Sequence, residues 1–177
     1  MYVKGRVGGL FGWRGLKTEG AQNYKLAATW LTPEVIYATA RLAQIHSYIS
    51  NEATRELATE AQLPRQTVIM VELDPREGSG VIPREWEAFL GPKRRGQIAS
   101  PVRGLNRPEL SNVLALAGVL RRNYDYDRFW ISFPLHRDDG TPLFDRSDTE
   151  AELAVRIHNQ EGHVSWRIPE SIRALAQ

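Results

Sequence analysis

The stretch Leu153–Ile168, which reads LAVRIHNQEGHVSWRI, decides most of the predicted fold. Apolar and polar residues alternate on both sides of Asn159–Gly162, and a period of two is typical of half-buried β-strands. A hairpin with a four-residue loop at Asn159–Gly162 would place Ile157 opposite Val164. We therefore predict a C-terminal β-hairpin, with His158 opposite His163, Val155 opposite Trp166 and Leu153 opposite Ile168.

The predicted hairpin has one apolar face and one polar face. A slip of one residue would turn the apolar side chains of one strand toward water, so the agreement between the two strands supports the pairing. The polar face is cationic. It comprises Arg156, His158, His163, Ser165 and Arg167.

Two histidines opposite each other raise the question of a metal site. Neutral imidazole nitrogens bind zinc, but a stable zinc site needs at least a third protein ligand, and the spacing identifies none. The acids that precede the hairpin belong to a segment of turn-forming residues. We therefore interpret the histidines as an exposed hairpin end and expect no metal or cofactor; the acids considered are Asp138, Asp139, Asp145 and Asp148.

Composition bounds the class of protein. The chain has 177 residues, of which 42% are hydrophobic and 25% charged, as in ordinary globular domains. It contains no cysteine, which excludes disulfides, thiolate nucleophiles and cysteine metal sites. No apolar run is long enough for a membrane span, and no export signal is visible. We expect a cytoplasmic protein, or an exported one if this is a mature chain.

The N-terminal segment is rich in glycine and in basic residues. Because glycine weakens both helices and strands, we predict an irregular arm over residues 1–22, followed by a single α+β domain over residues 23–177. Phe11 and Trp13 lie among these glycines, and we expect them to contact a partner or the rest of the chain.

The segment from Thr32 to Ile49 has a clear helical pattern. Thr32 suits the N-cap, Pro33 the first helical position and Glu34 the positive end of the helix dipole. Helical spacing relates a set of apolar residues that we predict to form the buried face. This set comprises Val35, Ala38, Leu42, Ile45 and Ile49.

The remaining elements follow from local signals. We predict strands at residues 24–30, a central one at Thr67–Leu73, and a half-buried one at residues 128–135. We predict helices at residues 51–62 and from Pro108 into the following apolar segment. We also predict a short helix at residues 83–90, with Pro83 at its start and Gly91 just past its end. Together these predict an α+β fold, mainly an antiparallel sheet with helices packed on one face.

Positive charge is concentrated in two tracts. Residues 4–17 and 93–107 contain basic residues and no acid, although the whole chain has a net charge of only +2. Basic residues with interleaved aromatics can neutralise phosphates and stack on bases. The possible nucleic-acid or anion contacts are Arg6, Arg14, Lys93, Arg94, Arg95, Arg103, Arg107, Arg156 and Arg167.

Glu72 and Asp74 form a pair of carboxylates of the kind that can act in catalysis. They lie two residues apart at the end of the predicted central strand, so their side chains share a face. Paired carboxylates can divide acid and base roles when their pKa values differ. We favour a structural role, in which Glu72 meets an arginine and Asp74 begins a turn.

These observations lead to a functional expectation without a named ligand. We expect a non-enzymatic binding or protein-interaction domain of bacterial origin, with an unknown protein as its partner. The possible interaction surface comprises Phe11, Trp13, His158 and His163. One alternative is a nucleic-acid-binding protein that uses the two basic tracts. A second alternative is a hydrolase that combines the Glu72 and Asp74 carboxylates with a histidine.

Overall fold

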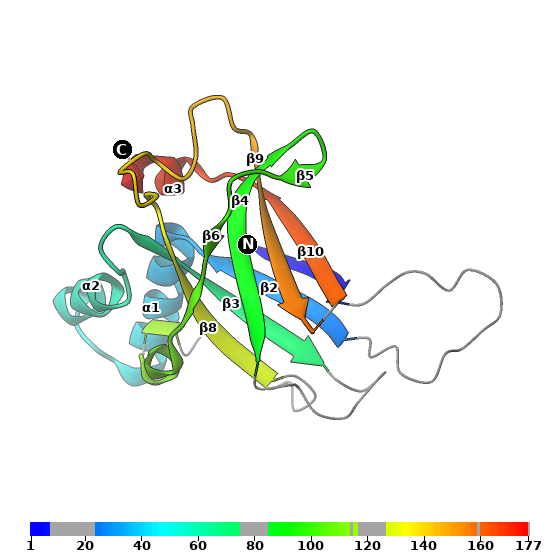
Figure 1. Cartoon of the computed structure of the whole chain (residues 1–177). Helices are drawn as coiled ribbons and strands as arrows, with labels where there is room; N and C mark the ends of the chain where they lie inside the picture. The colour runs from blue at the N-terminus through cyan, green and yellow to red at the C-terminus, as the bar shows by residue number, and fades with distance from the viewer. Residues whose placement is uncertain (8–23, 75–84, 114, 117–126, 159, 177) are drawn as a thin grey trace.

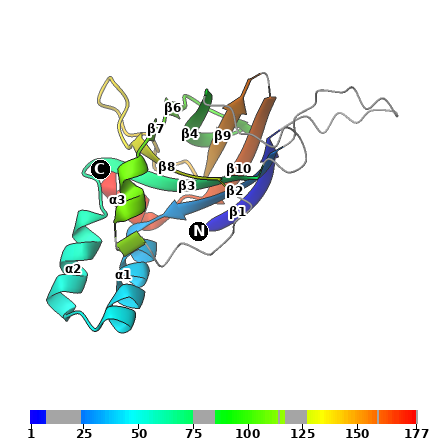
Figure 2. The same cartoon turned by 90° about the horizontal axis from the view of Figure 1, so that it is seen from below.

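A computed structural model describes residues 1–7, 24–74, 85–113, 115–116, 127–158 and 160–176. Two antiparallel sheets face each other, and two helices cover the outer side of the first sheet (Figures 1 and 2). The predicted α+β class, with mainly antiparallel strands, helices on one face and a C-terminal hairpin, is therefore confirmed. No helix of the described part is long and apolar enough to cross a membrane.

The first sheet has the strand order β1-β2-β3-β8-β7. Its strands are β1 (Tyr2–Val7), β2 (Tyr24–Leu31), β3 (Gln66–Asp74), β8 (Asp127–Pro134) and β7 (Leu105–Asn106). The β-branched run in β3 suits a strand that is covered on both faces, and β3 is buried almost throughout and central, as predicted. The half-buried prediction for β8 is wrong, because Trp130 and Ser132 on its second face are also buried.

The second sheet has the order β10-β9-β4-β5, and β6 also pairs with β4. Its strands are β4 (Trp86–Arg94), β5 (Gln97–Ile98), β6 (Val102–Arg103), β9 (Glu150–Ile157) and β10 (Gln160–Arg167). The helix predicted over residues 83–90 is therefore wrong where it overlaps β4. Alternation decides in favour of a strand, since Ala88 and Leu90 are buried on the inner face and the neighbouring strand β9 provides backbone partners.

The hairpin β9–β10 has the predicted faces but a different register. Val164 pairs with Leu153 rather than with Ile157, four residues away, and His158 lies in the turn with φ 53°. The four-residue loop and the opposition of His158 and His163 are therefore wrong, because a tighter turn was available. A shift of the pairing by an even number of residues keeps every side chain on its predicted face of the sheet. Trp166 is 3% exposed, while Arg156 and Arg167 are exposed.

The two sheets approach each other closely along both sides. A Cβ on Gly5 of β1 would lie 2.8 Å from Cγ1 of Val164 in β10, so the first side has no room for a larger residue. On the other side, residues 102–106 pass from β4 to β8, pairing first with one sheet and then with the other. Gly104 lies at this crossing, where a Cβ would lie 2.4 Å from Cγ2 of Ile131.

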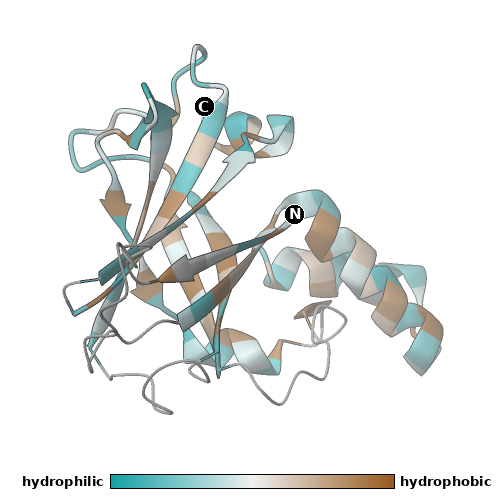
Figure 3. Cartoon of the chain, turned by 90° about the vertical axis from the view of Figure 1, so that its right-hand side faces the viewer, coloured by the Kyte–Doolittle hydropathy of each residue, from teal (hydrophilic) through white to brown (hydrophobic). Residues whose placement is uncertain are grey.

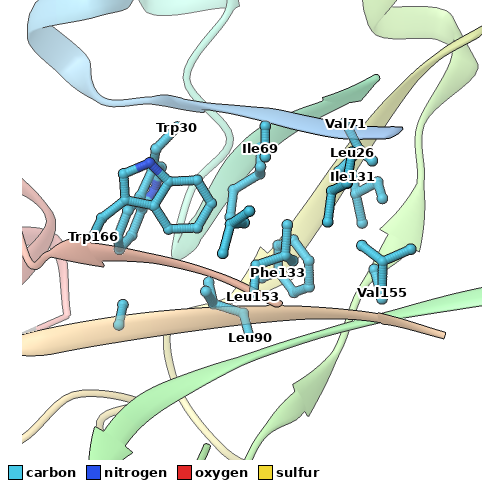
Figure 4. Packing of buried hydrophobic residues seen from close by; sticks show 14 of the residues in the cluster. Leu26, Trp30, Ile69, Val71, Leu90, Ile131, Phe133, Leu153, Val155 and Trp166 are labelled. Atoms are coloured by element: carbon cyan, nitrogen blue, oxygen red, sulfur yellow. The ribbon is translucent and has the colours of Figure 1, made fainter. Parts of the chain in front are cut away.

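The main core fills the space between the sheets. Trp30 and Trp166 meet edge to face with ring centroids 5.6 Å apart (Figure 4). Nε1 of Trp30 donates to Oγ1 of Thr67 at 2.7 Å. Around them pack aliphatic residues from both sheets, including Leu26, Ile69, Val71, Leu90, Ile131, Leu153 and Val155. These inward side chains fix the outward direction of their polar neighbours on the same strands.

The helices α1 (Pro33–Ser47) and α2 (Asn51–Glu60) form a hairpin over the first sheet. Thr32 caps α1 by accepting from the backbone N–H of Val35, and Pro33 occupies the first turn, as predicted. A second core joins these helices to the sheet through residues such as Ile36, Ala40, Ala58, Met70 and Trp130. A short helix, α3 (Glu170–Leu175), follows β10.

Two further predictions need correction. The irregular arm over residues 1–22 is wrong for Tyr2–Val7, which forms β1 by pairing with β2; residues 8–22 lie outside the described part. From Pro108, a 3-10 helix, η1 (Pro108–Asn112), replaces the predicted α-helix and ends at the extended Val113. Ser111 Oγ donates to the Pro108 carbonyl at 2.7 Å, a local bond that competes with regular helix formation. The end of the predicted helix lies outside the described part.

Candidate interaction surface

The outer face of the second sheet pairs several cations of the basic tract with acids. Lys93 Nζ donates to Ser165 Oγ at 2.9 Å and lies 3.5 Å from Glu152 Oε1. Ser165 Oγ in turn donates to the same Glu152 oxygen at 3.3 Å. Glu152 is buried, and a buried carboxylate needs partners for its charge. Lys93 and Ser165 provide them here.

Arg94 is also paired with acids, which belong to the loop that precedes β9. Its Nε and Nη2 donate to the Asp148 carboxylate at 2.7 and 3.0 Å, and Nη2 donates to Asp145 Oδ2 at 2.7 Å. These bonds raise the pKa of Arg94. Burial alone would raise the pKa of Asp148, but the hydrogen bonds from Arg94 and the Asp145 backbone outweigh it, so this pKa is lowered.

Other predicted anion contacts are paired in the same way. Arg103 lies 2.9 Å from Glu87, and Arg107 lies 3.3 Å from Glu109 and donates to Ser132. Arg156 holds Glu161 at 2.7 Å and lies over the Phe89 ring. Arg95 and Arg167 are exposed and form no ion pair with a described residue. The Arg6 side chain, Arg14, Phe11 and Trp13 lie outside what the structure describes.

The two hairpin histidines are separated. His158 occupies the exposed turn, whereas His163 lies within β10, paired with Ala154, and its Nε2 is 3.0 Å from Glu161 Oε1. Within the described residues, no group of three or more histidines and acids is arranged to hold a metal ion. The histidines therefore belong to two local environments and do not form one site.

Glu72 and Asp74 share the outer face of β3, as predicted. Glu72 accepts from Arg128 Nε at 2.9 Å, and Asp74 is fully buried with Lys25 Nζ at 4.0 Å. No hydrogen bond or ion pair joins either acid to a described histidine. The arginine partner proposed for Glu72 is thus present. The hydrolase alternative receives no support from the described geometry.

The largest departure from the expected surface lies on α1. Three of the residues predicted to be buried face outward: Leu42 is 46% exposed and Ile45 63%, while Ala38 is also exposed. Val35 is half-buried against the second core, and the half-buried Ile49 lies beyond the helix end. The buried face is formed instead by smaller residues together with one isoleucine. These are Ile36, Thr39, Ala40 and Ala43.

Exposed apolar side chains are concentrated on this helix. Of the eight large hydrophobic residues that are exposed in the described chain, Tyr37, Leu42 and Ile45 belong to α1, and Tyr48 is its C-cap. The helical hairpin projects from the sheets, and apolar bands are visible along it (Figure 3). Several large apolar side chains exposed on one element are typical of an interaction site. We call this face, formed by Ala38, Leu42 and Ile45 with the half-buried Val35 at its edge and with Tyr37 and Tyr48, the α1 outer face.

Sequence reasoning found the apolar residues of α1 but assigned them to the wrong side. The helix has two apolar faces, and the face with the smaller side chains allows the closer approach to the sheet and to α2. The small residues Thr39, Ala40 and Ala43 were the signal that could have revealed this arrangement. Comparisons of the chain with protein-family models, with curated proteins and with solved structures found no match.

Proposed function

We propose that the chain is a non-enzymatic protein-interaction domain in which the α1 outer face binds the same face of a second copy. The observation that supports this is the exposed apolar row on a helix whose opposite face is already buried in the fold. Covering that row would remove apolar surface from water, which is the main favourable contribution to association.

The spacing of the row indicates that its partner is a helix. Val35, Ala38, Leu42 and Ile45 are separated by three, four and three residues, as are the core positions of a coiled coil. Side chains in this pattern fit into the spaces between side chains of a second helix. A flat sheet or a loop would not match this arrangement.

A second copy supplies a complementary helix when the two lie antiparallel. If Ala38 lies opposite Leu42 of the second copy, the same symmetry places Val35 opposite Ile45. Glu34 at the start of one helix then lies opposite His46 near the end of the other. The helix dipoles oppose each other, which is favourable, and the small Ala38 leaves space for Leu42.

The position of the hairpin permits this contact. Beyond their contacts with the first sheet and with α3, α1 and α2 project away from the strands, so a second copy can approach the far part of α1 without meeting the sheets (Figure 2). With 15 residues, α1 is about 22 Å long. The contact is therefore small compared with a typical stable interface, and we expect a weak dimer.

Sedimentation equilibrium tests the proposal. We expect the wild-type chain to pass from monomer to dimer between about 1 μM and about 1 mM. Ile45→Glu should leave it monomeric throughout this range, because a charge would be buried in the contact. Leu105→Glu is a matched control, since Leu105 is 58% exposed but lies on β7. A monomeric wild type, or a dimer that Ile45→Glu does not weaken, would contradict the proposal.

A further inference from the structure

Three arginines that are distant in sequence line one cavity beside α3. Arg146 comes from the loop before β9, Arg167 from the end of β10 and Arg173 from α3. The cavity has a volume of about 400 Å³ and is also lined by Thr149 and Glu170. Arg167 alone of these arginines was predicted to contact anions.

The Arg173 guanidinium is held in place by backbone carbonyls. Its Nη1 donates to the carbonyl of Asp145 at 3.1 Å and, more weakly, to that of Arg146 at 3.5 Å, while Nη2 donates to the Asp148 carbonyl. These bonds use three of the five N–H donors of an arginine and leave the Nε–H among the unused ones. Carbonyls orient the group without neutralising it, so its positive charge is retained.

Arg146 and Arg167 also keep their charge. Both side chains are exposed, and neither forms an ion pair with a residue that the structure describes. Glu150 lies opposite Arg167 in the strand register, but the two groups are not within ion-pair distance. The nearest loop acids, Asp145 and Asp148, are occupied by Arg94.

The cavity lining is therefore strongly cationic. Three guanidinium groups face one carboxylate, that of Glu170, which gives the lining residues a net charge of +2. This contrasts with the predicted basic tract, where Lys93, Arg94, Arg103 and Arg107 are all paired with acids. Among the described residues, three guanidinium groups without a carboxylate partner are thus gathered at one cavity, whereas Arg95 is unpaired at a separate turn.

We propose that this cavity binds a phosphate group of a small molecule. The planar guanidinium presents paired N–H donors that match the oxygens of phosphate, and Thr149 adds a hydroxyl donor. The volume lies in the range of small-molecule sites. A nucleic acid fits less well, because four cations of the basic tract, Lys93, Arg94, Arg103 and Arg107, are already paired with acids and contribute little free charge to a polymer backbone.

Calorimetric titration of the full chain with inorganic phosphate and with pyrophosphate at low ionic strength tests this inference. We expect one site per chain, with pyrophosphate binding more tightly because it carries more charge. The double variant Arg146→Gln and Arg167→Gln should weaken pyrophosphate binding about tenfold or more, because two charge-assisted contacts are lost. Both residues are exposed, so the variant should remain folded.

Two comparisons make the test specific. Arg95→Gln removes an exposed, unpaired arginine from the turn between β4 and β5, and it should leave pyrophosphate binding unchanged. Absence of pyrophosphate binding would overturn the inference. So would binding that the double variant does not weaken, or equal weakening by Arg95→Gln. A single-stranded oligonucleotide that binds through Arg146 and Arg167 when pyrophosphate does not would also overturn it.

Discussion

The outer surface of the second sheet and the α1 outer face differ in how their side chains are partnered. On the sheet, Lys93, Glu152 and Ser165 are joined to one another, and Arg156 is joined to Glu161. On α1, Leu42 and Ile45 point into solvent. A surface whose groups are already satisfied gains little from a partner, whereas an uncovered apolar row gains from any helix that buries it.

The largest expected effect concerns the packing that holds the second sheet in place. Trp166→Ala should lower the free energy of unfolding by about 3–5 kcal/mol, because it empties a buried site between the sheets. Urea denaturation followed by circular dichroism measures this change. Tyr48→Ala is a matched control on the α1 side, since Tyr48 is 95% exposed, and it should be almost neutral. Similar losses for the two variants would contradict the comparison.

An intermediate effect concerns the Arg94–Asp148 pair beside the second sheet. Asp148→Asn should cost about 1–3 kcal/mol at pH 7, because hydrogen bonds to a charged group are lost. The folded-state pKa of Asp148 is lowered, so its contribution is complete above the pKa of the unfolded carboxyl and is lost as pH falls through the lowered value.

The acid limb of the stability profile measures this contribution. The wild type should keep its advantage over Asp148→Asn from pH 7 down to about pH 4, the usual pKa of an aspartate carboxyl, and lose it progressively as the pH falls further, through the lowered pKa of Asp148. Asp138→Asn, a change at an exposed acid, serves as the control and should follow the wild type. If the stability difference between the wild type and Asp148→Asn did not shrink in acid, the Arg94–Asp148 pair would not be the source of that difference.

The smallest expected effect lies on α1 itself. Ile45→Ser should change the free energy of unfolding of the monomer by no more than about 0.5 kcal/mol, because Ile45 already faces water. Denaturation at a protein concentration far below that of the proposed dimer measures it. A loss of several kcal/mol would mean that Ile45 is packed within the monomer, and the distinction between the two surfaces would no longer hold.

The hairpin shows how much of the fold local patterns can predict. The period of two in β9 and β10 correctly assigned Val155, Val164 and Trp166 to the buried face. The same pattern left the register open, because a shift of four residues keeps every side chain on its face. The turn decided the register through the left-handed backbone conformation of His158, which a non-glycine residue adopts only uncommonly.

Surface properties were harder to predict, because they depend on residues far apart in the sequence. Arg94 belongs to a tract without acids, yet its partner Asp148 lies 54 residues away. The arginine cavity likewise joins Arg146, Arg167 and Arg173 from three elements, so no spacing rule could have revealed it. On α1, local spacing identified the apolar row, but the closer packing of the alanines decided which side faced the sheet.

The crossing of residues 102–106 has a consequence for how the molecule melts. This short segment borders β4 in one sheet and β8 in the other, with Gly104 pressed against Ile131 and Phe133 between the two layers. If one sheet separated from the other, the segment would lose its backbone pairing with β4 or with β8, and the core between the sheets would be exposed to water. The β-strands should consequently unfold in a single cooperative transition, without an intermediate that retains one layer alone.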